Sequence, residues 1–194
     1  MSSAAILASG SGSNFEAIVE RVSTTDQSVV CLICDRKGAL VLERANRLAI
    51  PAHHVSYYKR ERREAEVEIE SILCDYGPDL VILAGFMRIL TPNFVKAFTG
   101  RIVNVHPALL PSHPGANGLK SSFSSADKRL GITVHYVDVG TDTGPVIRQE
   151  SFEREGTESL EEIERRIHEL EHSVFPDVVV NILDAKNRDN GSER

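Results

Sequence analysis

Two polar residues at the end of an apolar run have the types and spacing that acyl-transfer chemistry uses. In the segment Asn104-Val105-His106-Pro107, alternation along an extended strand puts Asn104 and His106 on the same side. An amide donor steadies the oxyanion of a tetrahedral intermediate, and an imidazole moves protons near neutral pH. The pair therefore favours transfer of an acyl group to an amine, with a purely structural histidine as the alternative.

A carboxylate that could support this histidine lies downstream, in the turn Thr141-Asp142-Thr143-Gly144-Pro145. An ionised Asp142 beside His106 would stabilise the imidazolium form and make it a competent acid at neutral pH. The alternative is an aspartate that serves only its own turn. The separation in sequence does not decide between the two.

A phosphate-binding turn is predicted at Ser9-Gly10-Ser11-Gly12-Ser13-Asn14, which follows an apolar strand and precedes a helix that begins near Asn14. Glycines allow a tight turn there, and the N–H groups of the helix N-terminus face an anion. The turn lacks the lysine of a Walker A loop and departs from the G-x-G-x-x-G spacing, which disfavours ATP and NAD. A turn without any ligand is the alternative.

The elements that must position these segments follow from the hydrophobic pattern. Apolar runs alternate with amphipathic stretches, which predicts a single α/β domain with a mostly parallel, open twisted sheet and helices on both faces. The run at 79–84 is nearly all apolar, as in a central strand buried on both sides. The other predicted strands are 4–8, 28–34, 52–55, 101–105, 131–138 and 146–152, and the clearest helices are 62–76 and a long C-terminal helix at 158–183.

Two further segments complete the expected organisation. The segment 107–127 carries three prolines and two glycines near its start and is predicted to be a long, structured and functional loop. The last residues, 186–194, are polar and lack an apolar anchor, so a domain at 1–185 with a disordered tail is expected.

Composition excludes several classes of partner. A net charge of −6 gives no basic surface for a nucleic acid. No stretch reaches the ~18 apolar residues that span a membrane, and the N-terminus lacks the features of a signal peptide, so a cytoplasmic location is expected. Cys31 and Cys34 could form a redox or metal clamp, but in a strand they would face opposite sides, which favours core packing. The histidines have no spacing typical of a metal site.

Four motifs together resemble a known family. Gly12-Ser13-Asn14, then 84–90 (AGFMRIL), then 104–111 (NVHPALLP), then Asp142-Thr143-Gly144-Pro145 resemble, over almost the whole chain, the glycinamide ribonucleotide formyltransferases of purine synthesis. Asn-x-His-Pro with a downstream Asp-x-Gly-Pro is shared by all folate-dependent formyltransferases. The resemblance implies a Rossmann-like formyltransferase fold, 10-formyltetrahydrofolate as co-substrate, no metal, small-molecule substrates, and a monomer or homodimer.

The resemblance also assigns roles to residues of this sequence. Asn104 would be the oxyanion donor, His106 the proton-transferring residue, and Asp142 the group that supports its imidazolium. The ribonucleotide would meet Gly12, Ser13, Asn14, His168 and Glu171. The formyl-folate would lie along Met87, Arg88, Ile89, Leu90 and Asn104, with Arg63 at its outer end and Asp138, Val139, Gly140, Thr141 and Asp142 around the pterin.

The chain departs from the family pattern at three places, and two other functions stay open. Ala108 replaces a common serine, His168 stands where a glutamine is common, and 115–120 lacks the usual histidines. One alternative is the hydrolase or sugar-amine branch of the formyl-folate enzymes, of which the hydrolase relatives carry an additional N-terminal domain. The other is a non-catalytic phosphate- or nucleotide-binding module around 10–14, which would bind a ligand without folate.

Overall fold

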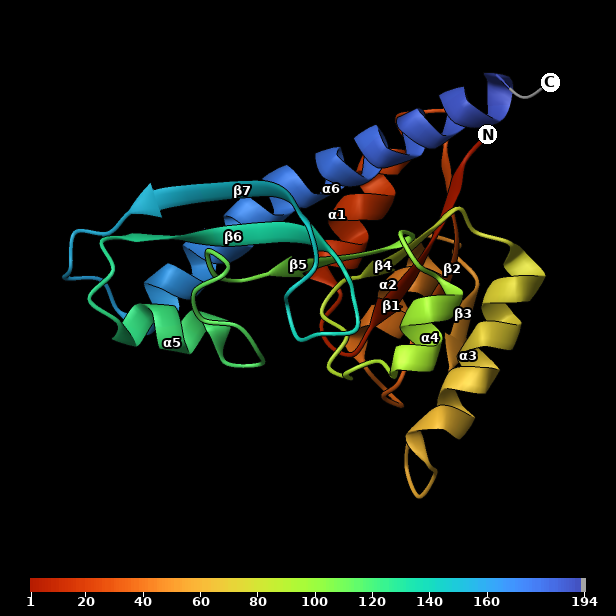
Figure 1. Cartoon of the computed structure of the whole chain (residues 1–194), viewed down its shortest axis with the longest axis horizontal. Helices are drawn as coiled ribbons and strands as arrows, with labels where there is room; N and C mark the ends of the chain where they lie inside the picture. Colours follow the sequence, from red (N-terminus) through yellow and green to blue (C-terminus); the bar gives the residue numbers. More distant parts are fainter. Residues whose placement is uncertain (193–194) are drawn as a thin grey trace.

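The alternating pattern of the sequence becomes one mixed sheet with helices on both faces (Figure 1). The structure, a computed structural model, describes residues 1–192. Its strands are β1 (Ser3–Ala8), β2 (Ser28–Cys34), β3 (Ala52–His54), β4 (Leu80–Leu83), β5 (Ile102–His106), β6 (Arg129–Tyr136) and β7 (Val146–Glu153). Its helices are α1 (Ser13–Val22), α2 (Leu40–Arg47), α3 (Arg62–Tyr76), α4 (Pro92–Ala97), α5 (Gly118–Ser124) and α6 (Leu160–Ser192).

The sheet has the strand order β3-β2-β1-β4-β5-β6-β7. The first five strands in this order are parallel, whereas β6 is antiparallel to β5 and β7 is antiparallel to β6. The mostly parallel α/β sheet is confirmed, and β4 is central and buried along its whole length. The order reverses between β1 and β4, the place where such sheets bind ligands beyond the carboxyl ends of their strands.

Two apolar layers cover the two faces of the sheet, and alternate side chains of β2 point into one layer or the other. One layer packs against α1, α2 and α6 and includes Cys34, whereas the other packs against α3 and α4 and includes Cys31. Both thiols are free and buried. The prediction that these two cysteines pack on opposite faces of the core is therefore confirmed. No described helix is long and apolar enough to cross a membrane.

The C-terminal helix differs from the expectation at its end. Helix α6 continues to Ser192, whereas 186–192 were expected to be disordered. Polar composition does not stop a helix when a contact holds it, and here the side chain of Asn187 accepts a hydrogen bond of 2.7 Å from Ser2. The part of the expected tail at 193–194 lies outside the described residues.

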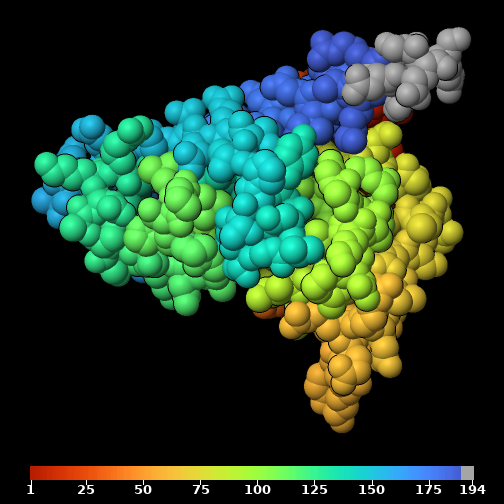
Figure 2. All heavy atoms as spheres, viewed as in Figure 1, coloured from red at the N-terminus to blue at the C-terminus, as the bar shows by residue number. Residues whose placement is uncertain are grey.

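Short helices account for the other differences. The segment 107–127 contains α5 rather than being a loop throughout, and α2 and α4 were not predicted because six to eight residues give a weak periodic signal. The chain before α3 forms a protrusion from the body of the protein (Figure 2). Tyr58, in this protrusion, is 76 % exposed.

Candidate active site

A cleft of about 280 Å³ lies between the segment after β4, the end of β5 and the connection from β6 to β7. Its walls combine apolar side chains with an amide, two imidazoles, two carboxylates and a guanidinium. Most of the residues predicted to meet the folate line it: Met87, Arg88, Ile89, Leu90, Asn104, Asp138, Val139, Gly140, Thr141 and Asp142.

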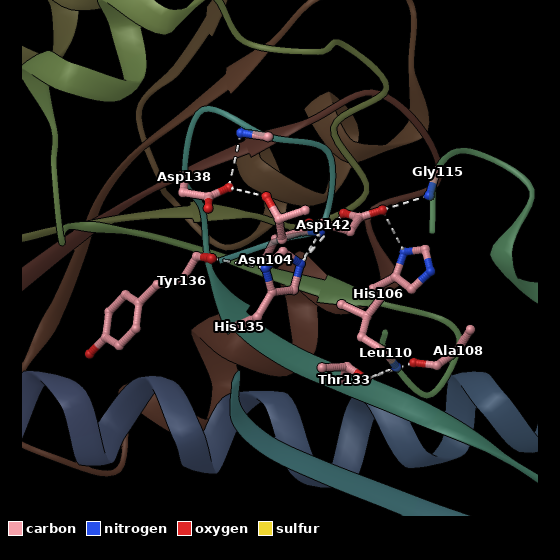
Figure 3. A network of polar contacts seen from close by, with 12 residues as sticks. Asn104, His106, Ala108, Leu110, Gly115, Thr133, His135, Tyr136, Asp138 and Asp142 are labelled. Atoms are coloured by element: carbon pink, nitrogen blue, oxygen red, sulfur yellow. Dashed lines mark hydrogen bonds and ion pairs between the residues drawn. The ribbon is translucent and has the colours of Figure 1, made fainter. Parts of the chain in front are cut away.

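His106 lies at the end of β5 and is 4 % exposed. Its Nε2 is 2.8 Å from the carbonyl oxygen of His113. Because a carbonyl only accepts hydrogen bonds, Nε2 carries a proton, and Nδ1 is the nitrogen that faces Asp142 (Figure 3). A Cβ at Gly118 would lie 2.5 Å from Nε2, so only glycine lets the start of α5 pack against the ring.

Asp142 lies beside His106, a contact that the sequence alone left undecided. The distance from Asp142 Oδ2 to His106 Nδ1 is 3.4 Å, and the backbone N–H of Gly115 donates a 2.7 Å hydrogen bond to the same oxygen. The pKa of the Asp142 carboxyl falls to about 2, mainly through His135, whose Nε2 lies 3.6 Å from Oδ1, with the Gly115 N–H and His106 adding to the effect and burial opposing it. Asp142 is therefore ionised throughout the neutral pH range.

Asn104 contacts a histidine to which sequence reasoning gave no role. Residues Asn104 and His135 are paired across β5 and β6, and Asn104 Nδ2 is 3.2 Å from His135 Nε2. His135 Nδ1 lies 2.9 Å from the carbonyl oxygen of Tyr136, so Nδ1 carries a proton, and Nε2 lies between the Asn104 amide and the Asp142 carboxylate. His135 thus holds the Asn104 amide at the wall of the cleft.

The turn between β6 and β7 is built to present Asp142. Asp138 Oδ1 accepts hydrogen bonds from the backbone N–H of Gly140 at 3.0 Å and from the hydroxyl of Thr143 at 2.7 Å. A Cβ at Gly144 would lie 1.8 Å from the carbonyl oxygen of Tyr136, which explains the glycine of the motif. Asp142 itself has a φ of 54°, a left-handed conformation that costs energy for a non-glycine residue.

The predicted phosphate-binding turn and α6 meet at a second place. Gly12 precedes α1 with a φ of 80°, and a Cβ there would lie 2.5 Å from Val41. Asn14 Nδ2 donates a 2.8 Å hydrogen bond to Glu171 Oε2. Burial raises the pKa of Glu171, while this hydrogen bond and the neighbouring His168 lower it. Residues far apart in sequence, all predicted to meet the ribonucleotide, thus come together here.

Arg63 is the predicted folate residue that the structure does not place at the cleft. It lies in the first turn of α3, next to the protrusion seen in Figure 2, and its guanidinium pairs with both carboxylate oxygens of Glu70. Its assignment to the outer end of the folate remains a prediction.

An α/β sheet that joins an amide, an imidazole and an ionised carboxylate in one cleft has the architecture of an enzyme rather than of a passive binding module. Residues 2–179 match a family model described as formyl transferase, so the chain belongs to the formyl transferase family.

Individual relatives agree with this family. The chain is 43 % identical over 187 residues to the phosphoribosylglycinamide formyltransferase of Bacillus subtilis, covering 95 % of this chain and 96 % of that protein. It is 40 % identical over 179 residues to the trifunctional purine biosynthetic protein adenosine-3 of Chironomus tentans, covering 88 % of this chain and 13 % of that protein. The crystal structure of glycinamide ribonucleotide transformylase 1 from Geobacillus kaustophilus superposes with a TM-score of 0.89 at 42 % identity, covering 94 % of this chain and 99 % of that one.

Proposed function

We propose that this protein transfers the formyl group of 10-formyltetrahydrofolate to the amine of glycinamide ribonucleotide. The observation that carries the proposal is the meeting of Asn104, His106 and Asp142 in one cleft, from three separate motifs of the family. The names of the relatives point to the same acceptor. The catalytic domain would comprise 1–185 and act in the cytoplasm, as a monomer or homodimer.

The cleft suits a formyl-folate, whose rings have apolar faces and polar edges. Met87, Ile89 and Val139 are 64 %, 66 % and 62 % exposed, and all three line this cleft. Large apolar side chains gathered around a polar centre are typical of a ligand site. The folate would cover them, with its formyl group directed at Asn104 and His106.

The ribonucleotide would bind where α1 begins. The helix N-terminus after Gly12 offers N–H groups to the phosphate. Glu171, already held by Asn14, would accept hydrogen bonds from ribose hydroxyls. His168, which is exposed and lies one turn before Glu171 on α6, would supply a further polar contact. This arrangement would place the substrate amine toward the cleft.

The chain's residues then have defined tasks in the reaction. As the amine nitrogen bonds to the formyl carbon, the carbonyl oxygen becomes an oxyanion, and the Asn104 amide together with protonated His106 Nδ1 would stabilise it. The attached amine loses a proton and the folate nitrogen gains one as its bond to the formyl carbon breaks. His106 would donate its Nδ1 proton to the folate nitrogen and then take up the proton of the amine, directly or through a water, and Asp142 would stabilise the imidazolium form before and after this exchange.

An acceptor panel tests the proposed reaction. Purified protein is incubated with 10-formyltetrahydrofolate and, separately, with glycinamide ribonucleotide, amino sugars, free glycinamide or no acceptor. Loss of the formyl group should depend on glycinamide ribonucleotide. Loss without any acceptor would indicate a hydrolase, loss with an amino sugar would indicate the sugar-amine branch, and either result would refute the proposal.

A further inference from the structure

The segment between β4 and α4, residues 84–91, forms one wall of the cleft, and side chains from other parts of the chain hold its backbone. Near its start, the hydroxyl of the buried Ser9 accepts a 2.8 Å hydrogen bond from the backbone N–H of Met87. Two acidic residues that do not line the cleft hold the rest. We call residues 84–91 the folate wall, because the proposed folate would lie against it.

Asp35 holds the middle of the folate wall. It directly follows β2, its side chain is 1 % exposed, and its Oδ2 accepts a 2.6 Å hydrogen bond from Arg88 Nε. The guanidinium of Arg88 also lies 4.8 Å from the centre of the Tyr57 ring, which supports it from another segment. Asp35 Oδ1 is buried and has no hydrogen-bond partner among the described residues. One contact, to Arg88, thus accounts for this buried charge.

Glu66 holds the end of the folate wall. It lies on α3 and is fully buried, and its carboxylate accepts a 2.8 Å hydrogen bond from the backbone N–H of Thr91 and another from the Thr91 hydroxyl. Thr91 is the N-cap of α4, where its hydroxyl oxygen accepts from the backbone N–H of Phe94. Glu66 therefore fixes the point at which the wall ends and the helix begins.

Burying two carboxylates is unfavourable for the fold by itself. Replacing buried ionic groups with apolar residues of similar size often leaves stability unchanged or raises it. Both carboxylates accept hydrogen bonds from the same segment, and neither of them lines the cleft. Since a binding site must be held to within about 0.5 Å by its supporting residues, their common effect falls on the ligand of the cleft.

We infer that Asp35 and Glu66 are positioning residues that set the affinity of the cleft for the formyl-folate without touching it. The inference rests on the proposed function, because it takes the folate as the ligand of the cleft. It separates the two substrates: the carboxylates should affect the folate and leave the ribonucleotide site near Gly12 and Glu171 unchanged.

The test uses the isosteric variants Asp35→Asn and Glu66→Gln. Each should raise the Kd for tetrahydrofolate, measured by calorimetry, and the KM for 10-formyltetrahydrofolate by about tenfold. The kcat at saturating donor and the KM for glycinamide ribonucleotide should change by less than about twofold. The matched control is Glu68→Gln, on the same helix as Glu66. It removes an exposed ion pair between Glu68 and Arg60 and should change none of these values.

A double-mutant cycle tests whether Asp35 affects folate binding through its contact with Arg88. Arg88→Met removes the contact to Asp35 and leaves that buried carboxylate without its partner, so the double variant, which carries no buried unpaired charge, is measured beside both single variants. If Asp35 acts through Arg88, adding Asp35→Asn to Arg88→Met should raise the Kd no further.

Three results would overturn the inference. They are unchanged folate affinity in both acidic variants, an equal loss of affinity for the two substrates, and additive effects in the cycle. A wild-type protein that binds no tetrahydrofolate would instead refute the proposed function, so the two failures are distinguishable.

Discussion

Replacing Asp142 with asparagine should destabilise the protein by an amount that follows from its surroundings. Neighbouring groups, His135 first among them, lower the pKa of the Asp142 carboxyl from 3.8 to about 2. One pKa unit corresponds to about 1.4 kcal/mol, so this carboxylate stabilises the folded protein by about 2 kcal/mol at neutral pH. The side chain is only 14 % exposed, so solvent screening removes little of this energy.

The sign of the pH dependence is fixed by the direction of the pKa change. Because the folded-state pKa is the lower one, the stabilisation is complete above the unfolded-state value of 3.8 and is lost as the pH falls through about 2. The free energy of unfolding should therefore differ between wild type and Asp142→Asn by about 2 kcal/mol at pH 7 and by about half of that at pH 3. Urea unfolding at the two pH values measures the difference.

A control and a kinetic readout complete this experiment. Asp177→Asn removes a carboxylate that is 49 % exposed and pairs with Arg21, and it should change stability by less than about 1 kcal/mol. Asp142→Asn should also lower kcat by about 10²-fold or more, because no ionised group then faces His106. Equal stability of Asp142→Asn and wild type at pH 7, or an equal difference at both pH values, would refute the reasoning.

Three further substitutions test other parts of the site. Asn104→Ala should lower kcat by about 10²–10³-fold and leave both dissociation constants nearly unchanged; normal turnover in a single-turnover assay would exclude Asn104 as the oxyanion donor. Gly12→Ala places a methyl group 2.5 Å from Val41 at a φ of 80° and should lower Tm by several degrees. The control is Gly10→Ala, whose methyl group would meet nothing within 4 Å. Equal Tm values for the two variants would contradict this prediction. Glu171→Gln should raise the KM for the ribonucleotide about tenfold. It should cause no loss of stability at pH 7, because burial raises the pKa of Glu171 and makes its ionised form unfavourable in the folded protein. A clear loss of stability in urea unfolding would contradict this.

Local patterns were enough to predict the sheet and half of the site. The apolar run of β4 predicted a central strand, and alternation along β5 correctly predicted that Asn104 and His106 share one side. These features depend on residues close together in sequence. The odd spacing of the two cysteines in β2 also predicted their opposite faces for the same reason.

Features that depend on distant pairing could not be derived in this way. His135 reaches Asn104 only because β6 runs antiparallel to β5 in one particular register. Asp35 and Glu66 reach the folate wall from β2 and α3, and nothing in their local patterns indicates burial. Arg63 pairs with Glu70, seven residues along the same helix, which no motif in the sequence signals.

The most direct test of the account follows the formyl carbon itself. With 10-formyltetrahydrofolate labelled with carbon-13 in the formyl group, and with glycinamide ribonucleotide as acceptor, nuclear magnetic resonance reports where the label goes. The account predicts that wild-type protein moves the label to the amine of the ribonucleotide, and that His106→Ala does so at least about 10²-fold more slowly. Label released as formate, or transferred equally fast by His106→Ala, would contradict it.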